Sequence, residues 1–208
     1  MLPPAGKRGM IITMNRSTQN VKNILIVGVG GQGTLLASKL MGKLFVEQGY
    51  DVKVSEVHGM SQRGGSVVTY VRYGDKVYSS LIEKGEADII ISFEQLEAAR
   101  WLAWLKPGGI LITSTQCIDP MPVIMGKAAY PDNILPSIEA LGVKTVAVDA
   151  LPLAMEAGSA RAVNVVLLGV AARELGFDRD IWENVIRTTV PPKTVEVNER
   201  AFALGYGA

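Results

Sequence analysis

The stretch from residue 23 to residue 57 decides the fold: NILIVGVGGQGTLLASKLMGKLFVEQGYDVKVSEV. It opens with an apolar run, rich in β-branched residues, that ends in glycine and predicts a buried strand. Leu36, Leu40 and Leu44 then recur every four residues, which is the spacing of one helix face. Residues 50–57 alternate in the manner of a second strand. Strand, tight turn, helix and strand together predict a βαβ unit, the repeating element of α/β folds.

The segments that follow extend this unit into a larger sheet. Residues 66–74 and 76–82 read as two strands separated by Gly-Asp, which predicts a β-hairpin and therefore a mixed sheet. Further strands are expected at 87–92, 110–113 and 143–148, and helices at 94–105 and 134–141. The proline-punctuated segment 118–136 is expected to be largely irregular.

The C-terminal third of the chain is predicted to be helical. An apolar helix over 160–175 is expected to be largely buried, and a last helix begins at Pro191-Pro192 and stops at Gly205. The predicted architecture is a three-layer α/β/α sandwich with a Rossmann-like, mixed sheet and C-terminal helices. One domain accounts for residues 21–208, and residues 1–20 are expected to form a disordered leader.

Composition narrows the class of protein. Of the 208 residues, 48% are hydrophobic and 20% charged, which is typical of globular proteins. A net charge of +1 gives no excess of positive charge that would attract nucleic acid or an anionic membrane. No apolar run has the length of a membrane span. The lone Cys117 favours a reducing cytoplasm and cannot supply the thiolates of an iron–sulfur cluster. We expect this thiol to be buried or half-buried and inert.

A glycine motif follows the first strand. Gly28, Gly30 and Gly33 spell G-x-G-x-x-G, with Gly31 and Gln32 between the last two glycines. Such a turn before a helix is typical of dinucleotide sites, in which an acidic residue like Glu56 would bond the ribose. The bulky polar residues directly after Glu56 would, however, crowd an adenosine. Two other interpretations stay open: tight packing of strand against helix, or the approach of a phosphate-bearing group or partner chain.

A second loop, SEVHGMSQRGG at 55–65, follows the second strand. In open α/β sheets ligands bind beyond the carboxyl ends of the strands, so this loop and the glycine motif are expected to meet at one edge. Arg63 could clamp a phosphate or carboxylate with its planar fork. No nucleophile has an adjacent base, so no catalytic residue is assigned. The candidate ligand or interface residues of this loop are His58, Ser61, Gln62, Arg63, Gly64 and Gly65.

These motifs carry a resemblance to a known family. The segments GVGGQGTLLASKLMG, SEVHGMSQRGGSV, ADIIISFEQLEAAR and NVVLLG resemble the gamma-type subunits or domains of the 2-oxoacid:ferredoxin oxidoreductases. Within that family the chain is most similar to the beta subunit of the indolepyruvate type. The similarity spans about residues 21–205, and the positions of Asn164, Asn198 and Gly205 fit the family pattern.

The resemblance implies a cytoplasmic enzyme subunit that is inactive alone. The complex would oxidatively decarboxylate an aryl 2-oxo acid such as indolepyruvate, form the acyl-coenzyme A and pass electrons to ferredoxin. Thiamine diphosphate and 4Fe–4S clusters would belong to a partner alpha subunit. The two loops would then pack against that subunit, contact the edge of its substrate site or contact the coenzyme A phosphates. Alternatives are a pyruvate- or 2-oxoglutarate-type gamma subunit, an NAD(P)-binding oxidoreductase, and a nucleotide- or coenzyme A-binding module.

Overall fold

The computed structural model describes residues 20–57 and 65–208. The predicted leader lies outside these ranges, apart from Asn20. The strands are β1 (Lys22–Val29), β2 (Asp51–Val57), β3 (Ser66–Gly74), β4 (Ala87–Ser92), β5 (Leu105–Ser114) and β6 (Lys144–Val148). The helices are α1 (Thr34–Glu47), α2 (Gln95–Trp101), α3 (Met121–Ile124), α4 (Ile134–Ala140), α5 (Ala150–Ala157), α6 (Val163–Leu175), α7 (Arg179–Thr189) and α8 (Val195–Gly207).

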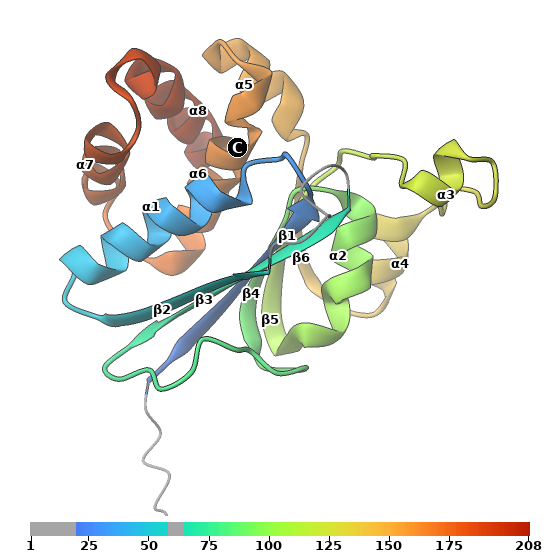
Figure 1. Ribbon diagram of the computed structural model, residues 1–208, viewed down its shortest axis with the longest axis horizontal. Helices are drawn as coiled ribbons and strands as arrows, with labels where there is room; N and C mark the ends of the chain where they lie inside the picture. Colours follow the sequence, from blue (N-terminus) through green and yellow to red (C-terminus); the bar gives the residue numbers. More distant parts are fainter. Residues whose placement is uncertain (1–19, 58–64) are drawn as a thin grey trace, which may run out of the picture.

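The six described strands form one mixed sheet in the order β2-β3-β1-β4-β5-β6. β1, β4, β5 and β6 are parallel, whereas β3 runs antiparallel between β2 and β1. Helices cover both faces, with α1, α5, α6, α7 and α8 on one and α2 and α4 on the other (Figure 1). The three-layer α/β/α prediction is confirmed.

The predicted hairpin after β3 is wrong, although the sheet is mixed as expected. Both edges of β3 are already occupied by β1 and β2, so residues 76–82 have no strand to join. Side chains bind this segment instead. The Asp51 carboxylate accepts a hydrogen bond from the Val77 amide at 2.9 Å, and Arg72 donates to the carbonyls of Ser79 and Leu81.

The layer formed by α1 and α5–α8 holds the larger core. The first ten residues of α6, at 163–172, are all buried, as predicted. α6 crosses α8 so closely that a Cβ on Gly169 would lie 2.3 Å from the Phe202 carbonyl oxygen. A Cβ on Gly205 would lie 1.9 Å from the Val166 carbonyl oxygen. Gly205 therefore permits a helix crossing and does not end α8, which corrects the prediction that the helix stops there.

The opposite layer is thinner. α2 and α4 pack on a smaller cluster that includes Leu25, Ile90 and Leu111. α2 ends at Trp101, and β5 begins at Leu105, so the residues between the predicted helix 94–105 and the predicted strand 110–113 lie inside a strand that pairs with β4 through a register shift. The segment 118–130 is mostly irregular, as expected, and carries the short helix α3 away from the body (Figure 1). Among the described residues, no helix has the length and apolarity needed to cross a membrane.

Candidate functional site

The glycine turn after β1 is fixed by backbone geometry. Gly31 and Gly33 have φ angles of 101° and 85°, in the left-handed region that side chains other than glycine rarely adopt. At Gly28 a Cβ would lie 2.8 Å from the Gln32 side-chain oxygen and 3.2 Å from the Phe93 Cβ. The backbone therefore favours glycine at Gly31 and Gly33 whether or not a ligand binds, and a side chain at Gly28 would displace the Gln32 amide or Phe93.

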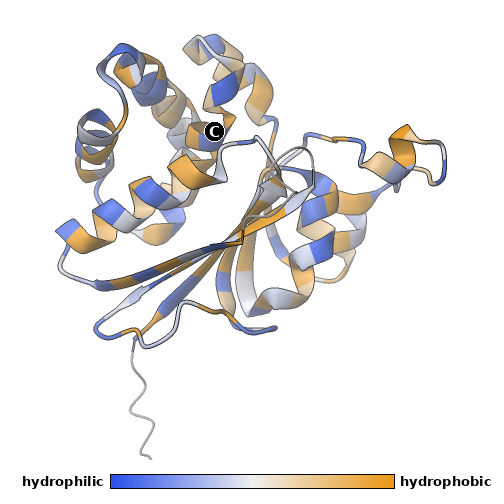
Figure 2. Cartoon of the chain, viewed as in Figure 1, coloured by the Kyte–Doolittle hydropathy of each residue, from blue (hydrophilic) through white to orange (hydrophobic). Residues whose placement is uncertain are grey.

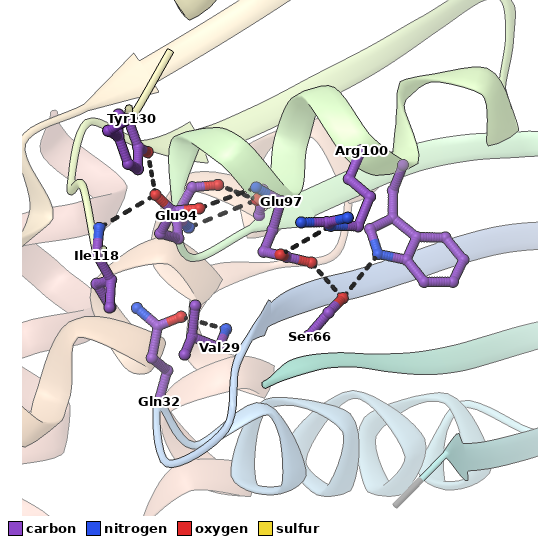
Figure 3. Close-up of polar contacts among 10 residues, drawn as sticks. Val29, Gln32, Ser66, Glu94, Glu97, Arg100, Ile118 and Tyr130 are labelled. Carbon is purple, nitrogen blue, oxygen red and sulfur yellow. Dashed lines mark hydrogen bonds and ion pairs between the residues drawn. The ribbon is translucent and has the colours of Figure 1, made fainter. Parts of the chain in front are cut away.

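Gln32 closes the crevice between the ends of β1 and β4. Its Oε1 accepts a hydrogen bond from the Val29 amide at 2.7 Å, and its Nε2 donates to the Phe93 carbonyl at 3.0 Å and to Gln116 Oε1 at 3.3 Å. Figure 3 shows the side chain turned back toward Val29. α1 and α2 leave this point toward opposite faces, so it is the position at which open α/β sheets usually bind ligands.

These contacts favour the packing interpretation of the glycine motif over the dinucleotide one. The Gln32 amide occupies the crevice with its own hydrogen bonds. Glu56, the predicted ribose ligand, accepts a hydrogen bond from Ser38 Oγ on α1 at 2.7 Å. The predicted ribose ligand and the side chain nearest the glycine turn are thus both engaged by the protein.

Asn164 links the glycine turn to the helical layer. From α6 its Nδ2 donates to the Gly33 carbonyl at 3.1 Å, and a Cβ on Gly33 would lie 2.5 Å from this nitrogen. Asn198 has a different role, because its Nδ2 bonds the Thr194 carbonyl one turn earlier along the same segment. Of the two asparagines in the family pattern, Asn164 is the one that contacts the site.

The two predicted loops meet, as the sequence indicated. The Gly30 amide donates to the Gly65 carbonyl at 2.9 Å, which joins the glycine turn to the residue before β3. The other candidates of the second loop lie outside the described residues, so their role stays a prediction; they are His58, Ser61, Gln62, Arg63 and Gly64.

Two buried carboxyl groups beside this junction were not singled out from the sequence. Glu97 accepts hydrogen bonds from Ser66 Oγ and, at 3.1 Å, from Arg100 Nε (Figure 3). Glu97 thereby fixes the start of β3 against α2. The signal was present in ADIIISFEQLEAAR, where two glutamates follow a buried strand at helical spacing, but a helix surface explains that pattern equally well.

Glu94, at the N-cap of α2, is 1% exposed and gathers three donors. Its Oε2 accepts from the Glu97 amide at 2.9 Å, while Oε1 accepts from the Ile118 amide at 3.2 Å and from the Tyr130 hydroxyl (Figure 3). Burial, and then the hydrogen bond to Glu94, raises the pKa of Tyr130 above its ordinary range. Tyr130 therefore acts as a hydrogen-bond donor at neutral pH and not as a base.

Cys117 corrects a prediction, because the structure exposes it on the loop after β5. Gln95 Nε2 donates to its sulfur at 3.2 Å. No group of three or more histidine, cysteine, aspartate or glutamate residues is placed to hold a metal ion within 20–57 and 65–208.

Two hollows flank the glycine turn. One, of about 280 Å³, lies toward β2 and β3, and its lining residues include Leu35, Val57, Val67 and Val68. The other, of about 430 Å³, lies toward α5 and is more polar, with lining residues that include Gln32, Gln116, Leu151 and Arg161. The described part of the edge offers hydrogen-bond donors and apolar walls.

Comparisons with known proteins identify the family of the chain. Residues 23–208 match the family model described as pyruvate ferredoxin/flavodoxin oxidoreductase. The chain belongs to this family. A protein from Thermococcus kodakarensis named indolepyruvate oxidoreductase subunit IorB is 49% identical over 191 residues, covering 89% of this chain and 95% of the relative.

Two solved structures of oxidoreductase chains share the fold. The gamma subunit of a keto/oxoacid ferredoxin oxidoreductase from Geobacter sulfurreducens has a TM-score of 0.67 at 23% identity, over 89% of this chain and 96% of its own. The 2-oxoglutarate:ferredoxin oxidoreductase from Magnetococcus marinus has a TM-score of 0.71 at 20% identity, over 90% of this chain and 30% of the longer one. The fold thus occurs both as a separate chain and as part of a longer one, and the predicted membership of the 2-oxoacid:ferredoxin oxidoreductases is confirmed.

Proposed function

We propose that this chain is the smaller subunit of an indolepyruvate-type ferredoxin oxidoreductase. The complex decarboxylates an aryl 2-oxo acid oxidatively, transfers the acyl group to coenzyme A and passes the electrons to ferredoxin. A larger alpha subunit performs the thiamine chemistry, and the isolated chain is inactive. The observation that carries the proposal is the 49% identity to an indolepyruvate oxidoreductase subunit over nearly the whole length of both chains.

The residues of this chain do not fit the resident groups of such an enzyme. A 4Fe–4S cluster takes four ligands, commonly thiolates, and this chain has one cysteine, whose exposed sulfur contacts Gln95. Thiamine diphosphate is held through a divalent cation bound by oxygen ligands, and in the described part of the chain no group of three or more histidine, cysteine, aspartate or glutamate residues is placed to hold one. We therefore assign both groups to the alpha subunit.

For coenzyme A, the co-substrate, we propose contact with the polar hollow beside the glycine turn. Arg161 is exposed on its wall, and none of the ion pairs among the described residues involves its guanidinium. A guanidinium is suited to phosphate oxygens because its donors form a planar fork. Gly31 lines the same hollow and lets a ligand approach the backbone closely.

The experiment is an anaerobic affinity purification of the tagged chain, followed by protein identification and by iron and thiamine diphosphate assays. A stoichiometric large partner that brings both iron and thiamine supports the subunit assignment. The complex is then assayed for methyl viologen reduction with indolepyruvate, pyruvate, 2-oxoglutarate and a branched-chain 2-oxo acid. A preference for pyruvate or 2-oxoglutarate would replace the substrate assignment, and turnover by the isolated chain would overturn the proposal.

A further inference from the structure

Residues 118–130, here called the arm, leave the body between β5 and α4 and return to it. Both ends of the arm meet at one side chain: the Ile118 amide and the Tyr130 hydroxyl donate to the same oxygen of Glu94. Glu94 is buried at the start of α2, so its carboxyl ties the arm to the body at its base. Because a buried carboxyl group that accepts several hydrogen bonds is held firmly, the base of the arm is anchored before any partner binds.

Between its two fixed ends the arm has its own internal structure. The Lys127 amide donates to the Pro122 carbonyl at 2.8 Å, and the Val123 amide donates to the Pro120 carbonyl at 2.9 Å. These bonds give the tip a defined backbone around α3 although it projects away from the sheet and its helices (Figure 1).

The tip exposes three large apolar side chains. Met121, Ile124 and Met125 are 59%, 65% and 56% exposed, and Figure 2 shows the resulting apolar colour of α3 at the end of the projection. The arm carries one acidic and one basic residue, Asp119 and Lys127, so it is electrically neutral. A clustered apolar tip on a fixed projection is typical of an interaction site, and methionines adapt their shape to the surface that covers them.

The arm is continuous with the candidate site. Ile118, at its base, lines the polar hollow together with Gln32 and Gly33 of the glycine turn. A partner that covers both the tip and the base of the arm would therefore also contact the polar hollow beside the glycine turn. In the Magnetococcus marinus enzyme the same fold is 30% of a longer chain, so other parts of an oxidoreductase chain accompany this fold there.

We propose that the arm is the docking element for the larger, thiamine-bearing subunit. Its apolar tip enters a neutral, apolar groove of that subunit, and Glu94 is the positioning residue that holds the arm in the docking direction. This proposal rests on the proposed function. It specifies which surface of this chain contacts the larger subunit and that the contacted face of that subunit is neutral and apolar. Family membership specifies neither.

The first test measures hydrogen–deuterium exchange, under anaerobic conditions, in the isolated chain and in the purified complex. We expect amides at 121–127 to exchange at least about tenfold more slowly in the complex, because docking excludes water from them. α7, on the opposite face of the sheet and without an exposed large apolar side chain, serves as the internal reference and should not change. Unchanged exchange at 121–127 in an intact complex overturns the docking proposal while the subunit assignment stands.

The second test measures binding of the purified alpha subunit by interferometry. The triple variant Met121→Ser, Ile124→Ser, Met125→Ser should raise the dissociation constant at least about tenfold, whereas Met155→Ser, a change of an equally exposed methionine on α5, should leave it unchanged. An unaltered dissociation constant for the triple variant contradicts the proposal. Failure of the wild-type chain to bind overturns the proposed function itself, and protection of 121–127 in a homodimer would assign the tip to a second copy of this chain.

Discussion

The two faces of the sheet are built differently. On one face α1 and α5–α8 enclose the larger core, in which α6 is buried over 163–172 and crosses α8 without room for a Cβ. On the other face the cover is thin, and buried carboxyls hold its parts together, Glu94 at the arm and Glu97 at the start of β3. We infer that the first face carries most of the stability, while the second positions the surfaces that meet other molecules.

The largest effect is expected at the α6–α8 crossing. Gly205→Ala would place a methyl group 1.9 Å from the Val166 carbonyl oxygen, and the backbone on both sides can relieve the clash only if the helices separate. We expect the free energy of unfolding in urea to fall by at least about 3 kcal/mol. Gly207→Ala, in the same helix with open space around it, is the matched control and should change stability by less than about 0.5 kcal/mol. Equal losses of stability in the two variants would show that the close α6–α8 crossing does not require glycine at residue 205.

A second prediction concerns alkaline pH and the same face. Tyr73 stacks on Phe45 at 3.8 Å, and burial, followed by the nearby charges of Tyr50 and Asp88, raises its pKa from 10.0 to about 12. The unfolded chain therefore loses this proton first, so the stability contribution is complete below pH 10 and is lost as pH rises toward 12, by about 2 to 3 kcal/mol. Urea titrations between pH 9 and 12 should show a shallower decline for Tyr73→Phe. An unchanged slope would mean that the hydroxyl is not protected.

On the thin face we expect a smaller and more local effect. Glu94→Gln keeps the shape but cannot accept three hydrogen bonds as a carboxylate does, which should cost about 2 kcal/mol. The signature is faster amide exchange at Ile118 and in the arm, while exchange across α6 stays as in the wild type. Glu139→Gln, an exposed change on α4, is the control. Uniformly faster exchange in both layers would show that the two faces do not behave independently.

The smallest effect is expected at the polar hollow. Arg161→Ala should leave the unfolding free energy within about 0.5 kcal/mol, because the side chain is exposed. In the assembled enzyme we expect the KM for coenzyme A to rise about fivefold to tenfold with kcat nearly unchanged, as for a lost phosphate contact. Arg161→Lys should restore part of the affinity. A KM identical to the wild-type value would contradict the proposal that coenzyme A contacts Arg161 in this hollow.

The thick face was largely predictable from the sequence, because long helices and buried strands leave periodic patterns. Residues 23–57 indicated β1, α1 and β2, and the apolar segment from 163 indicated a buried α6. The failures came from partners that local patterns do not encode. Residues 76–82 look like a strand, but β3 has no free edge, and Gly205 looks like a helix end until α6 is placed against it.

The location of the candidate site could be predicted from the sequence, but the contacts between its side chains could not. The sequence indicated that the glycine motif and the residue before β3 meet, and Gly30 does bond Gly65. It gave no sign that Gln32 closes the crevice, since an amide side chain can face solvent or protein equally well. Glu94 was missed because Ile118 and Tyr130, its donors, are far away along the chain.

The central claim is that this chain works only as part of a larger oxidoreductase. The most direct measurement is reconstitution: purified alpha subunit is titrated anaerobically with this chain while indolepyruvate- and coenzyme A-dependent reduction of methyl viologen is recorded. We predict no turnover by this chain alone, and a rise in activity that saturates at an equimolar ratio. Full activity of the alpha subunit without this chain, or turnover by this chain alone, would contradict the account.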